Sequence, residues 1–200
     1  MQLTEIRVAG FGGQGVIMCA SVIGRAASIV EDGFATMTQN FGPEARGGAC
    51  SAQLVLSPEP ILYPYIEQPD LMVLSSQEAF VKFAKDIKPG GTLIIEQDLV
   101  RVGEIDASDV KVYGIPSTRI AEELGKRMVQ NIVMTGFFGA VTGLIKRESL
   151  WKAVEDTIPA ASVELNRKAF DAGYEYGLQH LESGAIELDE EDPASICEQE

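Results

Sequence analysis

One short segment, Gly10-Phe11-Gly12-Gly13-Gln14-Gly15, restricts the fold of this chain more than any other. The mostly apolar residues 6–9 lead directly into it, and residues 16–30, which are rich in Val, Ile, Ala and Met, follow it. This order indicates a strand, a tight glycine turn and a helix. Glycines at these spacings let the backbone approach a pyrophosphate, and the N-terminus of the helix faces the anion. The segment therefore predicts an α/β fold with an anion site at its first turn.

The rest of the chain alternates between apolar runs and helical periods. Strands are expected at residues 34–38, 49–57, 70–75, 92–96 and 110–113, and helices at residues 77–87, 117–124, 131–144, 148–157 and 161–180. This alternation predicts a Rossmann-like, three-layer α/β domain with a mostly parallel sheet and a helical C-terminal part. We assign residues 1–180 to one domain, because 200 residues bury one ordinary hydrophobic core.

Residues 181–200 contain eight acidic residues and no Lys or Arg, which predicts a solvated, disordered tail; an acidic arm that docks on a basic partner is the alternative. The whole chain has 16 Lys and Arg against 30 Asp and Glu, a formal net charge of −14. This charge repels phosphate backbones and anionic lipids, so neither nucleic acid nor a membrane is an expected partner. We expect a cytoplasmic protein, because no export signal or long apolar stretch is present.

A second candidate anion site is the segment Gly42-Pro43-Glu44-Ala45-Arg46-Gly47-Gly48. Its paired glycines let backbone amides crowd an anion, while the guanidinium supplies charge and a planar donor fork. Loops that follow successive strands of a doubly wound sheet lie at the same edge, so this loop is expected to face the glycine turn. A turn that only packs helix on strand, and a surface loop with a solvated arginine, are the alternatives. The candidate binding residues are Gly12, Gly13, Gln14, Gly15, Arg46, Gly47 and Gly48.

A stand-alone NAD-binding oxidoreductase is one alternative function. An NAD site normally has an acidic residue at the end of the second strand, where it binds the ribose hydroxyls. Here Gln39 and Asn40 follow residues 34–38, and the acids Glu31 and Asp32 come before that strand instead. The sequence therefore disfavours NAD.

The chain contains few residues that could perform catalysis. Its single histidine, His180, is expected to be exposed on a helix. The three cysteines, Cys19, Cys50 and Cys197, lack the spacing of a zinc or iron-sulfur site. Cys19 is expected in the core, and Cys50 is a candidate for a lowered pKa because it lies beside the arginine loop. No catalytic and no metal-binding residue is therefore expected.

Several segments together resemble the gamma subunit of the 2-oxoacid:ferredoxin oxidoreductases. The likeness spans about residues 4–177 and is strongest to the 2-oxoglutarate branch. The segments are the glycine turn at 10–15, residues 41–48 and 57–61, Lys88-Pro89-Gly90-Gly91, Ile115-Pro116-Ser117-Thr118 and Asn131-Ile132-Val133-Met134-Thr135-Gly136.

The resemblance implies a subunit, inactive alone, of an enzyme that converts 2-oxoglutarate, CoA and oxidised ferredoxin to succinyl-CoA, CO2 and reduced ferredoxin. Thiamine diphosphate, Mg²⁺ and iron-sulfur clusters are then expected on alpha, beta and ferredoxin-like delta subunits, with CoA as co-substrate. The resemblance further implies that the candidate residues at 12–15 and 46–48 lie near the route of CoA. A subunit of the related indolepyruvate oxidoreductases, which shares both glycine segments, is the alternative. An obligate subunit is expected to expose an unusually large apolar patch on its glycine-rich and proline-rich loops.

Overall fold

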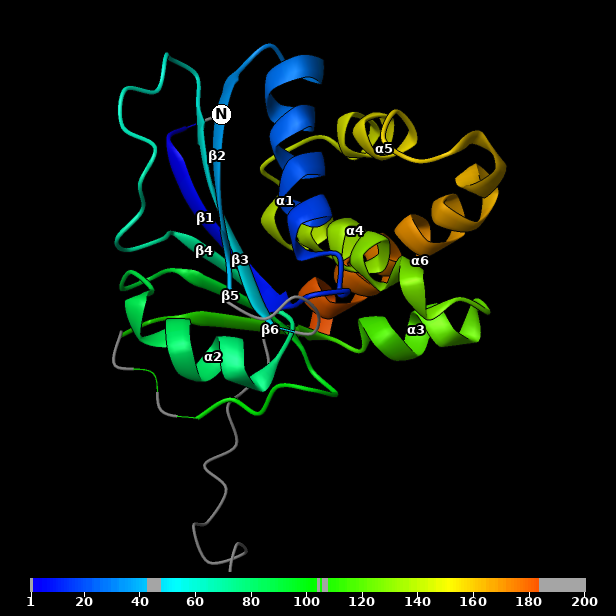
Figure 1. The fold of residues 1–200 in the computed structure, drawn as a ribbon. Helices are drawn as coiled ribbons and strands as arrows, with labels where there is room; N and C mark the ends of the chain where they lie inside the picture. Colours follow the sequence, from blue (N-terminus) through cyan, green and yellow to red (C-terminus); the bar gives the residue numbers. More distant parts are fainter. Residues whose placement is uncertain (1, 43–47, 104, 106–107, 184–200) are drawn as a thin grey trace, which may run out of the picture.

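The structure, a computed structural model, describes residues 2–42, 48–103, 105 and 108–183. These residues form a six-stranded sheet with helices on both faces (Figure 1). The strands lie in the order β2-β3-β1-β4-β5-β6. Their bounds are β1 (Thr4–Phe11), β2 (Phe34–Phe41), β3 (Ala49–Ser57), β4 (Leu71–Leu74), β5 (Thr92–Glu96) and β6 (Lys111–Ile115).

The sheet is mostly parallel, as the sequence predicts, but one strand runs against the others. Strands β1, β4, β5 and β6 pair parallel, whereas β3 is antiparallel to both β1 and β2. Residues 42–48 are too few for a crossover between parallel strands, so β2 and β3 form a hairpin. Because β2 points the same way as β1, the loop that follows β2 still lies at the edge of the sheet that carries the glycine turn.

The helices divide between the two faces of the sheet and create three layers. Leu71 and Val73 of β4 belong to a core cluster with α1, α4, α5 and α6, whereas Met72 and Leu74 of the same strand pack in a second cluster with α2. This alternation follows from the period of two along a strand. The helices are α1 (Val16–Arg25), which continues as a π-helical turn at Ala26–Val30, α2 (Gln77–Phe83), α3 (Ser117–Glu123), α4 (Gln130–Thr142), α5 (Arg147–Glu155) and α6 (Val163–Ser183), with 3₁₀ turns at Ala84–Asp86, Arg127–Val129 and Ala160–Ser162.

Helices α4 and α6 cross at very short range. A Cβ atom on Gly136 would collide with the carbonyl oxygen of Phe170, and one on Gly173 would collide with the carbonyl oxygen of Val133. Both collisions are with backbone, which cannot move aside without separating the helices. The C-terminal helices are therefore held in place by two positions that accept only glycine.

The expected domain end at residue 180 lies inside α6, which continues to Ser183. Residues 184–200 of the expected acidic tail lie outside the described residues. Within the described ranges, no helix combines the length and the apolar character needed to cross a bilayer.

The α4–α6 crossing gives a stability prediction. We expect Gly173→Ala to lower the free energy of unfolding by about 3 kcal/mol, because the added methyl group forces a backbone shift. Gly103→Ala is the matched control, since its nearest neighbour would be Phe80 Cε1 at 3.9 Å, and should change stability by less than about 0.5 kcal/mol. Urea unfolding followed by circular dichroism measures both. Equal midpoints for the two variants would contradict the close crossing.

Candidate functional site

The glycine turn ends at Gly15, which begins helix α1. Gly15 has a φ of 72°, in the left-handed region that side chains disfavour. A Cβ atom there would also lie 2.6 Å from the side chain of Asn131, at the start of α4. Glycine is thus required for two independent reasons. The absence of a side chain brings the first turns of α1 and α4 together.

Gln14 binds within the protein. Its Oε1 accepts a hydrogen bond from the amide of Phe11 at 2.7 Å, and its Nε2 donates to the carbonyl oxygen of Ser75 at 2.8 Å. Ser75 follows β4, the strand beside β1. The Gln14 side chain therefore fixes the glycine turn to β4, the next parallel strand. The strand order changes direction between β1 and β4, so this contact lies at the topological switch point of the sheet.

The turn presents unpaired amides at the N-terminus of α1. The amide of Gly12 donates to the carbonyl oxygen of Gly48 at 2.9 Å, and that of Gln14 donates to Phe11 at 3.1 Å. The amides of Gly13 and Gly15 have no acceptor among the described residues, and neither do those of the first turn of α1, which also lacks a side-chain cap and an acidic residue. These groups form a positive site that suits an anion.

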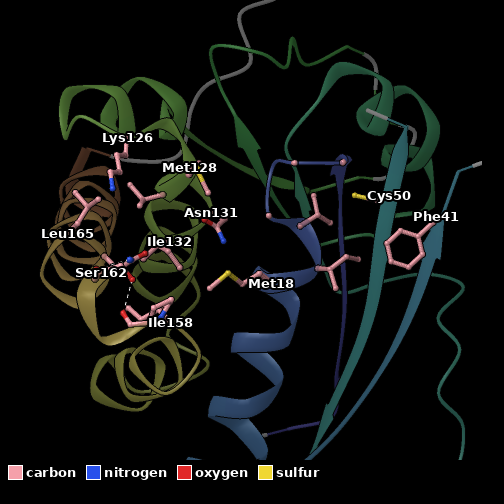
Figure 2. A pocket seen from close by; sticks show the side chains of 18 of the residues that line it. Met18, Phe41, Cys50, Lys126, Met128, Asn131, Ile132, Ile158, Ser162 and Leu165 are labelled. Atoms are coloured by element: carbon pink, nitrogen blue, oxygen red, sulfur yellow. Dashed lines mark hydrogen bonds between the residues drawn. The ribbon is translucent and has the colours of Figure 1, made fainter. Parts of the chain in front are cut away.

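The unpaired amides open into a hollow of about 660 Å³, called here the apolar hollow (Figure 2). Its walls come from the start of α1, the end of β2 and the start of β3, the start of α4 with the turn before it, and the connection from α5 into the start of α6. Most lining side chains are apolar. They include Val16, Ile17, Met18, Phe41, Cys50, Met128, Val129, Ile132, Ile158, Pro159 and Leu165.

Four polar residues that line the apolar hollow were not predicted as site residues: Lys126, Asn131, Ser162 and Asn166. Lys126 is the one cation among its described lining residues, and Figure 2 shows Asn131 between α4 and the start of α1. Asn131 is only 6% exposed, and its Oδ1 atom has no hydrogen-bond partner in the part of the chain that the structure describes. The available signals were a basic Gly125-Lys126-Arg127 segment and an amide at the head of an otherwise apolar helix.

The structure places the described members of the predicted binding set at one edge of the sheet. Gly12, Gly13 and Gly15 line the apolar hollow, and Gly48 joins them through its bond to Gly12. The side chain of Gln14 instead turns inward. Arg46 and Gly47 lie outside the described residues.

A buried polar cluster lies behind the glycine turn. Glu96, at the end of β5, accepts hydrogen bonds from the Ser117 hydroxyl and from the Thr118 amide, the latter at 2.9 Å. The Thr118 hydroxyl donates to Gln130 Oε1 at 2.8 Å. These bonds connect the ends of β5 and β6 to the start of α4. The cluster therefore supports the site from within.

The topology argues against the NAD alternative. The strand beside β1 on the hairpin side is β3, which is antiparallel, so its carboxyl end lies at the opposite edge. No acidic residue at the end of that strand can reach a ribose at the glycine turn. Glu31 is also engaged elsewhere, because its Oε1 accepts a hydrogen bond from the Lys146 amide at 2.9 Å.

Both described thiols lie in environments that disfavour the thiolate. Burial raises the pKa of Cys19 to about 11. Burial also raises the pKa of Cys50, so the expectation of a lowered value is wrong. In the described ranges, no group of three or more His, Cys, Asp or Glu side chains is placed to hold a metal ion.

His180 is not the exposed helical residue that the sequence suggested. Its ring lies about 6 Å from the rings of Tyr113, Phe137 and Tyr176, and it stacks on Tyr176 at an interplanar angle of 18°. Its buried Nε2 atom has no hydrogen-bond partner among the described residues. Burial lowers the pKa of this imidazole. His180 is a packing residue of α6.

The comparison with protein families gives one match over most of the chain. The family model described as pyruvate ferredoxin/flavodoxin oxidoreductase matches residues 5–176. Among solved structures, the gamma subunit of a keto/oxoacid ferredoxin oxidoreductase from Geobacter sulfurreducens is 36% identical, with a TM-score of 0.76. The match covers 88% of this chain and 99% of that subunit.

Individual subunits of related enzymes are also similar to this chain. The 2-oxoglutarate synthase subunit KorC of Methanocaldococcus jannaschii is 45% identical over 86% of this chain and 92% of its own. KorC of Methanothermobacter thermautotrophicus is 43% identical over 86% of this chain and 93% of its own. The pyruvate synthase subunit PorC of that same organism is 33% identical over 86% of this chain and 95% of its own.

The environment of His180 gives a pH prediction. Above a pH of about 6.5, the ordinary histidine pKa, the ring is neutral in both the folded and the unfolded chain. Below it, the unfolded chain binds a proton more readily than the folded chain, so this residue lowers stability as the pH falls toward the folded-state pKa. As the pH falls through this window, we expect the unfolding free energy of the wild type to decrease relative to that of His180→Phe. Urea titrations at several pH values test it, and parallel profiles would contradict the assignment.

Proposed function

The chain belongs to the pyruvate ferredoxin/flavodoxin oxidoreductase family, and from this membership we propose that it is the gamma subunit of a 2-oxoglutarate:ferredoxin oxidoreductase. In this reaction 2-oxoglutarate, CoA and oxidised ferredoxin yield succinyl-CoA, CO2 and reduced ferredoxin. The observation that carries the choice of substrate is the contrast within Methanothermobacter thermautotrophicus. There the subunit named for 2-oxoglutarate is 43% identical to this chain and the one named for pyruvate only 33%.

The proposal assigns the redox chemistry to other chains. Thiamine diphosphate and Mg²⁺ would lie on alpha and beta subunits, and iron-sulfur clusters on a ferredoxin-like delta subunit that passes electrons to ferredoxin. One histidine and three cysteines in the whole sequence support this division. The two described cysteines are free thiols, which suits a complex in the reducing cytoplasm.

Exposed apolar side chains support an obligate partnership. Leu62 is 96% exposed and Tyr63 is 66% exposed in the proline-rich connection between β3 and β4. Phe41 and Met128 are also exposed, and both line the apolar hollow. Such side chains are costly to leave in water. We propose that the alpha and beta subunits cover them.

The edge of the sheet fits the CoA co-substrate. The unpaired amides at Gly13 and Gly15 and the positive end of α1 suit a diphosphate, and Lys126 supplies a cation on the facing wall. The apolar walls suit the uncharged parts of such a ligand. We include Gly12, Gly48, Arg46 and Gly47 in this site, and we assign Gln14 to holding the turn in place.

The complex itself is the first test. The tagged full chain is purified anaerobically from its own cells, and the eluate is assayed for CoA-dependent viologen reduction with a panel of 2-oxoacids. We expect the thiamine-binding and cluster-bearing chains to co-purify, and activity with 2-oxoglutarate alone. Activity confined to pyruvate or indolepyruvate would refute the substrate, and a lone inactive chain would refute the subunit assignment.

The assigned role of Lys126 gives a kinetic prediction. In the purified complex, Lys126→Gln should raise the KM for CoA about tenfold, because a charge-assisted bond contributes about 1.5 kcal/mol. The KM for 2-oxoglutarate should not change. Lys111→Gln is the matched control, since Lys111 is an exposed lysine at the other end of the parallel strands. A KM for CoA that stays constant, or a parallel rise in both KM values, would remove Lys126 from the site.

A further inference from the structure

Strand β2 forms one outer edge of the sheet, and its outward backbone groups can be identified from the register. Gly42 donates its amide hydrogen to Ala49 directly beyond the strand, which marks the even-numbered residues of β2 as those that bond to β3. The amides and carbonyls of the alternate residues point away from the sheet. No described residue pairs with this outward row, which consists of Ala35, Met37, Gln39 and Phe41.

Within the part of the chain that the structure describes, this edge has no lysine, proline or bulge that would protect it against another strand. The segment Phe34–Phe41 contains no charged residue and no proline, and its pairing with β3 is continuous over all 8 residues, without a bulge. Phe34 is 43% exposed and Phe41 is 63% exposed, at the two ends. Soluble proteins normally place a lysine, a proline or a bulge on such an edge. A regular, uncharged edge is able to pair with another strand.

We propose that a second copy of this chain pairs with β2 in antiparallel orientation, with the two Thr38 residues facing each other across a twofold axis. In this register Ala35 faces the second copy's Phe41, and Met37 faces its Gln39. In this register every outward residue of each strand is hydrogen-bonded to the other strand. A register in which fewer residues overlap would leave some of them unpaired. Facing threonines are a favourable cross-strand pair. The strands bring no like charges together, although each chain carries a net charge of −14.

The helical layer leaves room for this pairing. Helix α1 packs mainly against β3, where a Cβ atom on Gly24 would touch Leu54 at 3.0 Å. In the pair, the two β3 strands are separated by three strand spacings, about 14 Å. Packed helices need only about 8–10 Å between their axes. The two α1 helices therefore fit side by side over a continuous sheet.

A disulfide tests the register directly. In an antiparallel pair without mutual hydrogen bonds, facing Cα atoms lie about 4.5 Å apart, within the range that a disulfide spans. We expect Thr38→Cys, in a full chain that also carries Cys197→Ser, to form a covalent dimer under mild oxidation. Thr36→Cys in the same background is the control. Its two cysteines would be about 13 Å apart along the strands, so they should not link. No link at Thr38→Cys, or an equal link at Thr36→Cys, overturns the proposal.

A second pair of variants tests the pairing without a new thiol. The Gln39 amide points outward, so Gln39→Pro removes a bond to the second copy and none within the chain. Sedimentation equilibrium should give a dimer for the wild type and for Gln39→Ala, and a monomer for Gln39→Pro with an unchanged circular dichroism spectrum. The Thr38→Cys link should also form in the purified complex. If the wild-type chain is monomeric and its outer β2 amides are protected from hydrogen exchange, residues of the same chain cover the edge. That result would refute the pairing.

Discussion

The absence of a side chain at Gly15 is the constraint on which the site depends. It lets the Asn131 amide lie against the glycine turn, so the N-terminus of α4 lies beside the N-terminus of α1. From that point α4 carries α6 with it, because Gly136 and Gly173 allow the two helix backbones to approach closely. The far wall of the apolar hollow belongs to this helical layer. A few positions without a Cβ atom therefore set the distance between the two walls.

The elements were predictable because local signals set them. Proline and glycine stop strands, and a period of two or of 3.6 separates strands from helices, so β3 and β5 have the bounds that the sequence predicts. Strand pairing is a different matter. Periodicity carries no information about the neighbour of a strand. Only the length of the connection, expected at residues 39–48 and observed at 42–48, indicates that β2 and β3 form a hairpin. The environment of His180 was hidden for the same reason, since its aromatic neighbours Tyr113 and Phe137 come from β6 and α4.

The candidate site was predictable on one side only. A glycine spacing indicates backbone amides, because glycine is needed wherever the chain must turn sharply or approach a ligand. The facing wall contributes single side chains, Lys126 and Asn131, that lie more than a hundred residues away in the sequence. No local pattern distinguishes such a lysine from a solvated one. The polar side chain of Gln14 suggested a contact with the anion, but its hydrogen-bonding groups are already bonded to Phe11 and Ser75.

The strong negative charge of the chain does not conflict with an anion site at the edge of the sheet. Repulsion between exposed charges is screened over about 8 Å at physiological ionic strength, so distant acids contribute little there. The helix N-terminus and Lys126 act at contact distance, and the apolar walls exclude the water that would weaken their field. A buried acid near the turn would be more serious. Glu96 is a buried acid behind the turn, but it does not line the apolar hollow, and its side chain accepts hydrogen bonds from the Ser117 hydroxyl and the Thr118 amide.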